Sequence, residues 1–353
     1  MRLAVVAPTL GILGGQGVQA RALLDGLRED GYEATLVPID AEWPAFLRRL
    51  RRLRYVRTAV NQMFYAASLR RLRRADVVHV FSASYWSFLL APLPAMAAAR
   101  LFGKRVVLNY HSGEAEDHLA RWGVLVHPGL WLAHEIVVPS EYLRLVFVSH
   151  GYPARVVRNT VDLSRFQYRE RDPLRPRLLS TRNLEPHYRV DDTLEAFALL
   201  KARYPDATLV VAGYGSEETR LARLARSLGV DGVRFLGRVE RQEMPRVYAD
   251  ADVFVNASTV DNQPLSVLEA FASGLPVVST PTGDIGAMVR DGETGLLVPA
   301  RDPAAIAKAV TVLLEDPDHA RGLARHARLD VDDYTWPRVR EQWARVYGGQ
   351  PPV

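Results

Sequence analysis

Several residue types and patterns are missing from this chain of 353 residues. It contains no cysteine, which excludes disulfide bonds and thiolate metal sites and is expected of a protein in a reducing cytosol. Lysine is limited to Lys104, Lys201 and Lys308, and none of them stands in a recognisable pyridoxal phosphate site, which disfavours a phosphorylase that uses that cofactor. No apolar run reaches the roughly 18 residues that span a bilayer.

The composition that remains is that of a globular protein, with 48% hydrophobic and 24% charged residues. Because single cores stop growing at about 250–300 residues, the length predicts two domains. The first apolar segment, residues 3–7, is too short for a signal peptide and is followed by a glycine loop, so it reads as a strand.

Strand-like and helix-like segments alternate along the whole chain, which predicts parallel sheets covered by helices. We expect one series of strands at 3–7, 33–38, 77–81, 106–110 and 135–139, and a second at 178–180, 207–212, 233–236, 253–256, 276–279 and 295–298. The prediction is an α/β protein with two Rossmann-like, doubly wound domains that face a cleft. Residues 1–165 form the first domain, 166–176 a linker and 177–335 the second domain, and a helix within 336–353 packs back on the first.

In open α/β sheets ligands bind beyond the carboxyl ends of the strands. Two glycine loops stand at such positions, one with Gly15 and Gln16 after the first strand and one with Gly213 and Gly215. Bare backbone there admits a phosphate or sugar, although an ordinary tight turn explains the same residues. The loop after the first strand lacks the Gly-x-Gly-x-x-Gly spacing of a dinucleotide site and the Gly-Lys-Ser/Thr ending of a P-loop, which disfavours dehydrogenases and kinases.

The segment from Ser258 to Thr280 carries the strongest signal. A loop there leads into a helix that starts at Leu265 or Ser266, and the amides at that start favour a bound diphosphate. Glu269, one turn inside the helix, can accept hydrogen bonds from two vicinal hydroxyls, as a ribose presents. Asp261, in the loop, can reach a sugar beyond the phosphates.

The same segment resembles the hallmark of the family 4 glycosyltransferases, which have the GT-B architecture. Asp261 is followed by seven residues, Glu269 and the run Ala-Phe-Ala-Ser-Gly-Leu-Pro-Val-Val. Further matches extend the resemblance over essentially the whole chain: "VVPSEYL" at 137–143, "RNTVDLSRF" at 158–166, "VAGYGS" at 211–216, "VRFLGRV" at 233–239, "YADADVFVNAS" at 248–258 and "DGETGLLVP" at 291–299.

The resemblance implies a retaining, metal-independent transferase that moves a sugar from a nucleotide diphosphate to an acceptor on the first domain. It implies that Glu269 holds the ribose and that Gly213 and Gly215 shape the nucleotide pocket. Further residues are implied for the donor site: Asp261, Asn262, Gln263, Pro264, Leu265 and Ser266 at the sugar and phosphates, Val239 near the base, and Gly15 and Gln16 at the diphosphate. His111 would hydrogen-bond the transferring sugar, with a structural hydrogen bond as its alternative.

Three departures from the family pattern change these expectations. The first acidic residue is Asp261 instead of Glu. The family's Arg and Lys clamp on the diphosphate becomes Arg182 with Tyr188 at the Lys position, so Arg189 is the substitute we expect. Arg is a planar fork and Lys a point charge, so the geometry would differ. The Gly-Gly-Ile-Pro-Glu motif is altered to Gly283-Asp284-Ile285-Gly286-Ala287.

As a mechanism we expect front-face attack with retention, in which Arg182, Arg189 and the helix amides stabilise the leaving diphosphate. No metal is then required, and the letters Asp250-Ala251-Asp252 fall at a strand entry, not in a convincing metal motif. Glu114 and Asp117 could orient the acceptor or act as its base, although solvated loop carboxylates explain them as well. Tyr85, Trp86 and Phe88 could also lie close to the cleft or the membrane side, with core packing as the alternative.

Arginines crowd one region of the first domain, and Arg48, Arg49, Arg51, Arg52 and Arg54 flank apolar residues at near-helical spacing. This pattern predicts a basic amphipathic helix on an anionic membrane surface. Packing on its own domain is the alternative, and nucleic acid is disfavoured because stacking aromatics are missing. We therefore expect a cytoplasmic enzyme, peripheral on the inner face of the membrane, with a glycan, lipid or lipid-linked acceptor in cell-envelope or exopolysaccharide synthesis.

Two other functions remain open from the sequence: a sugar-nucleotide epimerase on the same architecture, and a degenerate nucleotide-sugar-binding scaffold at a membrane. The sequence does not reveal which sugar is moved, which nucleotide carries it or which hydroxyl receives it, because pocket selectivity rests on a few hydrogen bonds.

Overall fold

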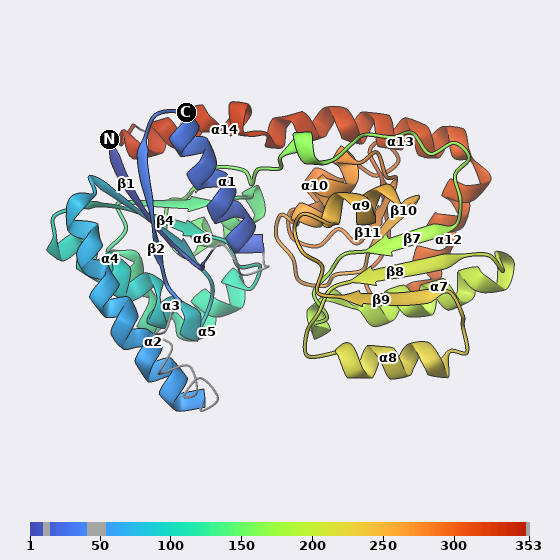
Figure 1. The fold of residues 1–353 in the computed structure, drawn as a ribbon, viewed down its shortest axis with the longest axis horizontal. Helices are drawn as coiled ribbons and strands as arrows, with labels where there is room; N and C mark the ends of the chain where they lie inside the picture. The colour runs from blue at the N-terminus through green and yellow to red at the C-terminus, as the bar shows by residue number, and fades with distance from the viewer. Residues whose placement is uncertain (10–14, 41–53, 351–353) are drawn as a thin grey trace. The chain divides into compact units, whose positions relative to one another are not determined.

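The computed structural model describes residues 1–9, 15–40 and 54–350. The chain divides into two compact units (Figure 1). Unit 1 contains Met1–Thr160 and Val339–Val353, and unit 2 contains Val161–Arg338.

Unit 1 is built on a parallel sheet of six strands in the order β2-β1-β3-β4-β5-β6. The strands are β1 (Arg2–Ala7), β2 (Glu33–Pro38), β3 (Val77–Ser82), β4 (Arg105–Tyr110), β5 (Glu135–Val138) and β6 (Arg155–Val156). The helices are α1 (Gly15–Glu29), α2 (Arg54–Ser68), η2 (Leu69–Arg74), α3 (Trp86–Leu90), α4 (Pro92–Leu101), α5 (Ala115–Leu130), α6 (Glu141–Ser149) and most of α14 (Trp336–Tyr347).

The strands of this sheet are apolar along most of their length because helices cover both faces. Alternate strand residues such as Val78 and Val80 pack in one core with the buried side chains of η2, α4, α5 and α6. On β3, the residue between them, His79, is also fully buried, and its ring contacts Trp343 and Tyr347 of α14.

Polar groups fix α14 to this sheet. His79 Nδ1 lies 2.9 Å from the Tyr347 hydroxyl, and the Asn109 amide nitrogen lies 3.1 Å from His79 Nε2. Burial lowers the pKa of His79 to about 3, with a smaller effect from His111, whose own pKa burial lowers to about 3. Burial also lowers the pKa of His118 to about 4, against the opposing charge of Asp117. These three histidines of unit 1 are therefore neutral at pH 7.

Unit 2 has a second parallel six-stranded sheet, in the order β12-β11-β10-β7-β8-β9. Its strands are β7 (Arg177–Ser180), β8 (Thr208–Ala212), β9 (Val233–Gly237), β10 (Val253–Asn256), β11 (Val277–Ser279) and β12 (Leu296–Leu297). Its helices are η3 (Leu163–Arg165), η4 (Pro186–Tyr188), α7 (Val190–Arg203), α8 (Glu218–Ser227), α9 (Met244–Ala249), α10 (Leu265–Ala272), α11 (Ile285–Met288), α12 (Pro303–Glu315), α13 (Pro317–Asp330) and η5 (Val331–Tyr334).

This second order is the one expected of a dinucleotide-type doubly wound sheet, in which the chain runs outward from a central strand and then restarts on its other side. The central strand is β7, and β10 lies beside it. The strands predicted from the sequence are all present with ends within one residue, and β6 is the strand that the prediction missed.

The predicted linker, residues 166–176, is wrong. Phe166 is buried in unit 2, and the Arg171 side chain, 2% exposed, donates hydrogen bonds to the carbonyls of Ala251, Tyr248 and Ser273. The Asp-Pro and Arg-Pro pairs that suggested a linker belong to a segment that packs on the sheet. The division between the units falls earlier, between Thr160 and Val161.

We expect unit 1 to lose stability as the pH falls from about 6.5 towards 4. A histidine whose folded pKa lies near 3 binds its proton in the unfolded chain first, so each one lowers the free energy of unfolding by up to about 1.4 kcal/mol per pH unit in this range. Urea unfolding of the His79→Gln variant should show a shallower dependence on pH than the parent. Equal slopes for the parent and His79→Gln would contradict the assignment.

Candidate active site

The loops that follow β7 and β10 meet at the carboxyl end of the unit 2 sheet. These two strands are neighbours, but the chain continues from β7 to β8 on one side and from β10 to β11 on the other. The place between β7 and β10 is therefore the switch point, where such folds bind ligands. Arg182 lies in the first of these loops and Asp261 in the second.

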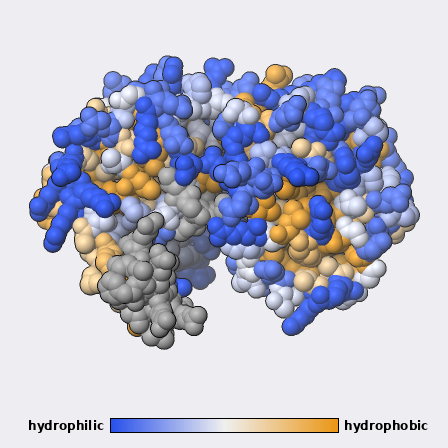
Figure 2. All heavy atoms as spheres, viewed as in Figure 1, coloured by the Kyte–Doolittle hydropathy of each residue, from blue (hydrophilic) through white to orange (hydrophobic). Residues whose placement is uncertain are grey.

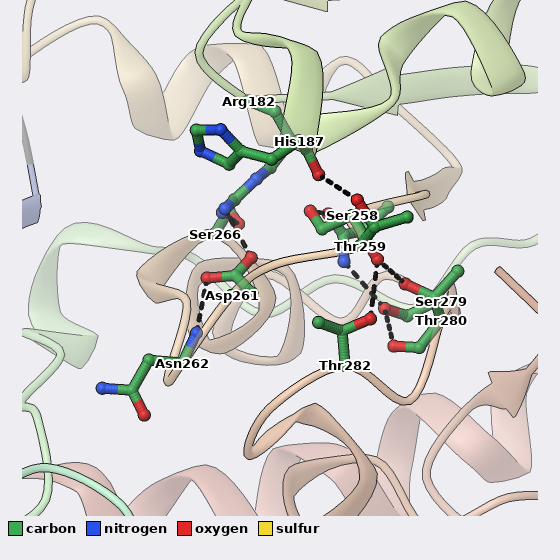
Figure 3. Close-up of polar contacts among 11 residues, drawn as sticks. Arg182, His187, Ser258, Thr259, Asp261, Asn262, Ser266, Ser279, Thr280 and Thr282 are labelled. Atoms are coloured by element: carbon green, nitrogen blue, oxygen red, sulfur yellow. Dashed lines mark hydrogen bonds and ion pairs between the residues drawn. The ribbon is translucent and has the colours of Figure 1, made fainter. Parts of the chain in front are cut away.

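Arg182 joins the two loops. Its Nη2 lies 2.5 Å from Asp261 Oδ2 and its Nη1 donates to Ser266 Oγ at 2.9 Å (Figure 3). The Tyr188 ring lies against the guanidinium, with 4.2 Å from Cζ to the ring centroid, a cation–π distance. Arg182 is 8% exposed, and its Nε is buried without a hydrogen-bond partner among the described residues. The guanidinium is thus held rigidly, and its Nε–H is among the donors that remain without a partner.

Backbone contacts fix the loop after β10 to its surroundings (Figure 3). The Ser258 carbonyl accepts hydrogen bonds from the hydroxyls of Thr280, at 2.6 Å, and Thr282, at 2.7 Å. The Thr259 amide and hydroxyl both donate to the His187 carbonyl, at 2.8 and 3.1 Å. The loop therefore holds its shape through contacts with the segments after β7 and β11.

The same loop leads directly into α10. Asp261 Oδ1 accepts the Asn262 amide at 2.9 Å, and the Gln263 side-chain nitrogen donates to Asp284 Oδ2 at 3.0 Å. Gly283 must be glycine, because its φ is +61° and a Cβ there would lie 2.2 Å from the Asp261 carbonyl oxygen. Pro264 occupies the N-cap of α10 and forms no side-chain cap, and its carbonyl accepts the Val267 amide at 3.2 Å, so the amides that precede Val267 are the ones a ligand would meet.

Glu269 lies one turn inside α10 and is half-buried. Burial raises its pKa to about 7, although a hydrogen bond from Tyr248 and the charges of Arg165 and Arg241 lower it. The Tyr248 hydroxyl also lies 2.7 Å from Thr181 Oγ1 and 3.2 Å from the Ser266 carbonyl oxygen. A carboxyl group that changes its charge near neutral pH therefore stands beside the start of the helix.

The predicted glycines after β8 have a packing role. A Cβ on Gly213 would lie 1.9 Å from the Arg182 carbonyl oxygen, and one on Gly215 would lie 2.3 Å from the Leu184 carbonyl oxygen. Their missing side chains let the loop after β8 press on the loop that carries Arg182. This close approach explains both glycines, and a direct contact with a nucleotide stays a prediction.

Arg189 was predicted as the second cation of the diphosphate clamp. It adopts φ 49° at the N-cap of α7 and is paired with two carboxylates of the first turn, at 2.6 Å from Asp192 and 3.2 Å from Asp191. The hydrogen bond to Asp192 raises the pKa of Arg189. A diphosphate would have to draw Arg189 away from these carboxylates, whereas Arg182 already has an unused donor.

Val239, predicted near the base, lines a groove of about 1020 Å³ that strands β7–β9 and helix α9 form together. Its apolar lining includes Val210, Leu236 and Val247. Figure 2 shows hydrophobic surface in this region of unit 2. The sequence did not reveal this groove, because strand alternation alone does not say that part of a sheet face is left uncovered.

In unit 1 the predicted residues converge on the Ser82 carbonyl, at the end of β3. Gln16 donates its side-chain amide to that carbonyl at 2.9 Å, and the His111 backbone amide donates to it at 3.1 Å. The His111 ring stacks on Phe81 at 5.1 Å, and its Nε2 is buried without a hydrogen-bond partner among the described residues. Gly15 leaves open space where a Cβ would stand.

The two carboxylates predicted to orient the acceptor, Glu114 and Asp117, differ in their contacts. Glu114 is exposed at the N-cap of α5 and makes no side-chain cap. Asp117 accepts a hydrogen bond from the Tyr85 hydroxyl at 2.6 Å and pairs with Arg121 at 2.7 Å. The sequence could not reveal the partnership of Asp117 with Tyr85, because 31 residues separate the two positions.

The arginine-rich segment is described only in part. Arg48, Arg49, Arg51 and Arg52 lie outside the described residues, and Arg54 begins α2. In η2, Leu69 and Leu72 are buried in the core of unit 1, while the arginines of that segment are exposed: Arg70, Arg71, Arg73 and Arg74. Among the described residues there is no helix long and apolar enough to cross a membrane.

The Asp250-Ala251-Asp252 segment has a structural role in unit 2. Asp252 is fully buried and receives the Arg177 guanidinium at 2.5 and 3.1 Å. Within the described parts of the chain, no three acidic, histidine or cysteine side chains are grouped as metal ligands would be.

Comparison with known proteins gives the chain a family. Residues 13–165 match the model of "Glycosyltransferase Family 4", and residues 164–330 match "Glycosyl transferases group 1". A glycogen synthase of Mycobacterium tuberculosis is 32% identical over 78% of this chain and 69% of the relative. A GDP-mannose-dependent alpha-(1-6)-phosphatidylinositol monomannoside mannosyltransferase of Mycolicibacterium smegmatis is 31% identical over 74% of each chain.

A solved structure shares the fold. HepE from Anabaena in complex with UDP-glucose superposes with a TM-score of 0.78 at 16% identity, over 99% of this chain and 100% of that one. Family models match both halves of the chain, and curated glycosyltransferases are more than 30% identical to it. The two doubly wound sheets and the switch-point site on the hallmark segment agree with these matches. The chain therefore belongs to the family 4 glycosyltransferases of GT-B fold.

Proposed function

We propose that unit 2 binds a nucleotide diphosphate sugar at the start of α10 and that the enzyme transfers the sugar with retention to a glycan, lipid or lipid-linked acceptor. The observation that carries this proposal is Arg182, a nearly buried guanidinium with an unused Nε, fixed by Asp261, Ser266 and Tyr188 beside a helix start without a side-chain cap. HepE, a structural relative, was solved with UDP-glucose, which supports a nucleotide-sugar donor.

Arg182 and the first amides of α10 would stabilise the negative charge that develops on the leaving diphosphate. Donors that are already oriented towards such charge supply the largest catalytic contribution in many enzymes. Arg189 would add a second cation after exchanging its pair with Asp192 for the diphosphate. Because these groups can balance the charge themselves, the proposed reaction uses no metal.

Glu269 would accept hydrogen bonds from the two ribose hydroxyls, and Asp261, with Asn262 to Ser266, would contact the sugar and the distal phosphate. In unit 1, the unpartnered His111 Nε2 is the proposed partner of the transferring sugar, and Gln16 and Gly15 are proposed for the diphosphate. In the proposed front-face reaction the leaving phosphate takes the acceptor proton, with Glu114 or Asp117 orienting the acceptor hydroxyl.

We also propose that the basic surface of unit 1 attaches the enzyme to the inner face of the membrane from the cytoplasm, where envelope or exopolysaccharide precursors are assembled. The exposed arginines of η2 and the basic segment before α2 support this proposal. Each arginine near an anionic bilayer contributes on the order of 1 kcal/mol.

The function itself is tested by incubating the enzyme with UDP-, GDP- and ADP-sugars and following nucleotide diphosphate release with acceptor mixtures. We expect turnover with one nucleotide class and a loss of about 10²–10³-fold in kcat for Arg182→Lys, because removing one oriented donor from a developing charge costs that much. Arg226→Gln, an exposed arginine of α8, is the control with unchanged rate. Donor binding without turnover, with any acceptor, would instead support a nucleotide-sugar sensor.

The charge of Glu269 predicts how donor affinity depends on pH. A ribose needs the carboxylate form, and the free enzyme protonates Glu269 below its pKa of about 7. Donor Kd should therefore rise about tenfold per pH unit below 7 and level off above it. Calorimetric titrations between pH 5.5 and 8.5 measure this, with Glu269→Gln expected to bind weakly at every pH. If Glu269→Gln keeps the parent's pH dependence, another group is responsible.

Membrane attachment predicts co-sedimentation with vesicles that contain anionic phospholipid and release at 0.5 M salt, where charges are screened within a few ångströms. The Arg70→Gln/Arg74→Gln variant should bind several-fold more weakly. Arg223→Gln/Arg226→Gln, an equal change of charge on exposed arginines of α8, is the matched control and should bind as the parent does. Equal losses for the two variants would point to net charge alone and not to a defined surface.

A further inference from the structure

Three aromatic residues of unit 1 form a surface platform that the donor chemistry above does not use. Tyr85 immediately precedes α3, Trp86 begins it, and Trp122 lies on α5. The Trp86 and Trp122 rings meet edge to face at 5.3 Å, and the Tyr85 and Trp122 rings at 5.7 Å. Trp86 is 65% exposed, while Tyr85 and Trp122 are half-buried beside it, so the platform presents mainly the Trp86 ring to solvent.

The backbone of Tyr85 is strained. Its φ of 56° with ψ of −132° is a combination that residues with a side chain rarely adopt, at a cost of about 1–3 kcal/mol. The hydroxyl hydrogen bond to Asp117, at 2.6 Å, and the edge contact with the His118 ring, at 5.1 Å, hold the side chain in place. Strain of this kind persists where the surroundings fix one conformation, and it concentrates at ligand sites.

A buried chain of polar groups supports the platform from below. Ser84 Oγ lies 2.8 Å from the Tyr110 hydroxyl, which lies 2.8 Å from His118 Nδ1. His118 is fully buried, and its ring contacts both Tyr85 and Trp122. The aromatic rings are therefore positioned before a ligand arrives, which reduces the entropy lost on binding.

The platform begins beside the proposed reaction site of unit 1. The Ser82 carbonyl anchors both Gln16 and the His111 backbone, and Ser84 and Tyr85 follow on the same loop. Figure 1 shows α3 and α5, which carry the platform, next to each other, and the two helices are in contact. A molecule that lies on the platform can thus reach the end of β3.

The charges around the platform restrict which molecules fit. Three carboxylates stand at the start of α5: Glu114 and Glu116, which are exposed, and Asp117. The cation Arg121 is already paired with Asp117. Burial, the hydrogen bond to Asp117 and the charges of Glu114 and Asp117 together raise the pKa of Tyr85, although Arg121 opposes them. This local field repels phosphate and other anions.

We propose that Tyr85, Trp86 and Trp122 form the acceptor subsite and that it takes a neutral sugar ring of a glycan, not a phosphorylated acceptor. The apolar face of a sugar ring packs on aromatic side chains, and its hydroxyls donate hydrogen bonds to carboxylates such as Glu114. This inference rests on the proposed function, because the subsite would hold the acceptor of the proposed transferase. It uses only contacts within unit 1.

Calorimetric titration with neutral gluco-, manno- and xylo-oligosaccharides, and separately with inositol 1-phosphate and with anionic vesicles, tests the subsite. We expect at least one neutral oligosaccharide to bind, Trp86→Ala to weaken it tenfold or more, and Trp86→Phe to restore most of the affinity. Trp131→Ala, which removes another exposed tryptophan, beyond the end of α5, is the matched control and should bind as the parent does.

Three results would overturn the subsite: no neutral oligosaccharide binds, Trp86→Ala binds as tightly as the parent, or the loss in Trp86→Ala appears for inositol 1-phosphate or vesicles instead. Donor affinity, measured on the same proteins with UDP-, GDP- and ADP-sugars, separates this test from the function. If oligosaccharide binds at Trp86 but no nucleotide sugar binds the parent, the donor proposal fails and the glycan subsite stands.

Discussion

The ion pair between Arg182 and Asp261 is the contact on which the candidate site depends. It ties the loop after β7 to the loop after β10, two segments 79 residues apart that meet because β7 and β10 are neighbours in the sheet. Tyr188 and Ser266 fix the same guanidinium from two further directions. A nearly buried charge is costly unless it is paired, so the pair also determines that these loops keep one shape.

Close backbone packing makes this arrangement possible. Gly213 and Gly283 let neighbouring loops press on the carbonyls of Arg182 and Asp261, the two residues of the ion pair. The altered Gly-Asp-Ile-Gly-Ala segment thus keeps one glycine that the geometry requires, while its Asp284 receives the Gln263 side chain. Unit 1 has a comparable anchor in the Ser82 carbonyl, which holds Gln16 and His111 together and leads into the strained Tyr85.

The sequence predicted the strands well because strands covered on both faces are nearly continuous apolar runs, which local patterns reveal. It failed for residues 166–176, where prolines suggested a linker although Arg171 satisfies carbonyls inside unit 2. The prediction also missed β6, because two residues are too few to show the alternation of a strand. In both cases the local structure is decided by contacts with residues distant in the chain.

For the site, the sequence by itself determined the family segment, the start of α10 and the place of Glu269 one turn inside it, because spacing along a helix is a local property. Tertiary structure alone decided which side chains are partners. Arg182 contacts Asp261 and Tyr188, Arg189 pairs with Asp192, and Tyr85 donates a hydrogen bond to Asp117. The sequence shows which side chains can carry a charge. Which of their hydrogen-bond donors stay without a partner, and how far their pKa shifts, depends on the groups that folding brings within hydrogen-bond distance.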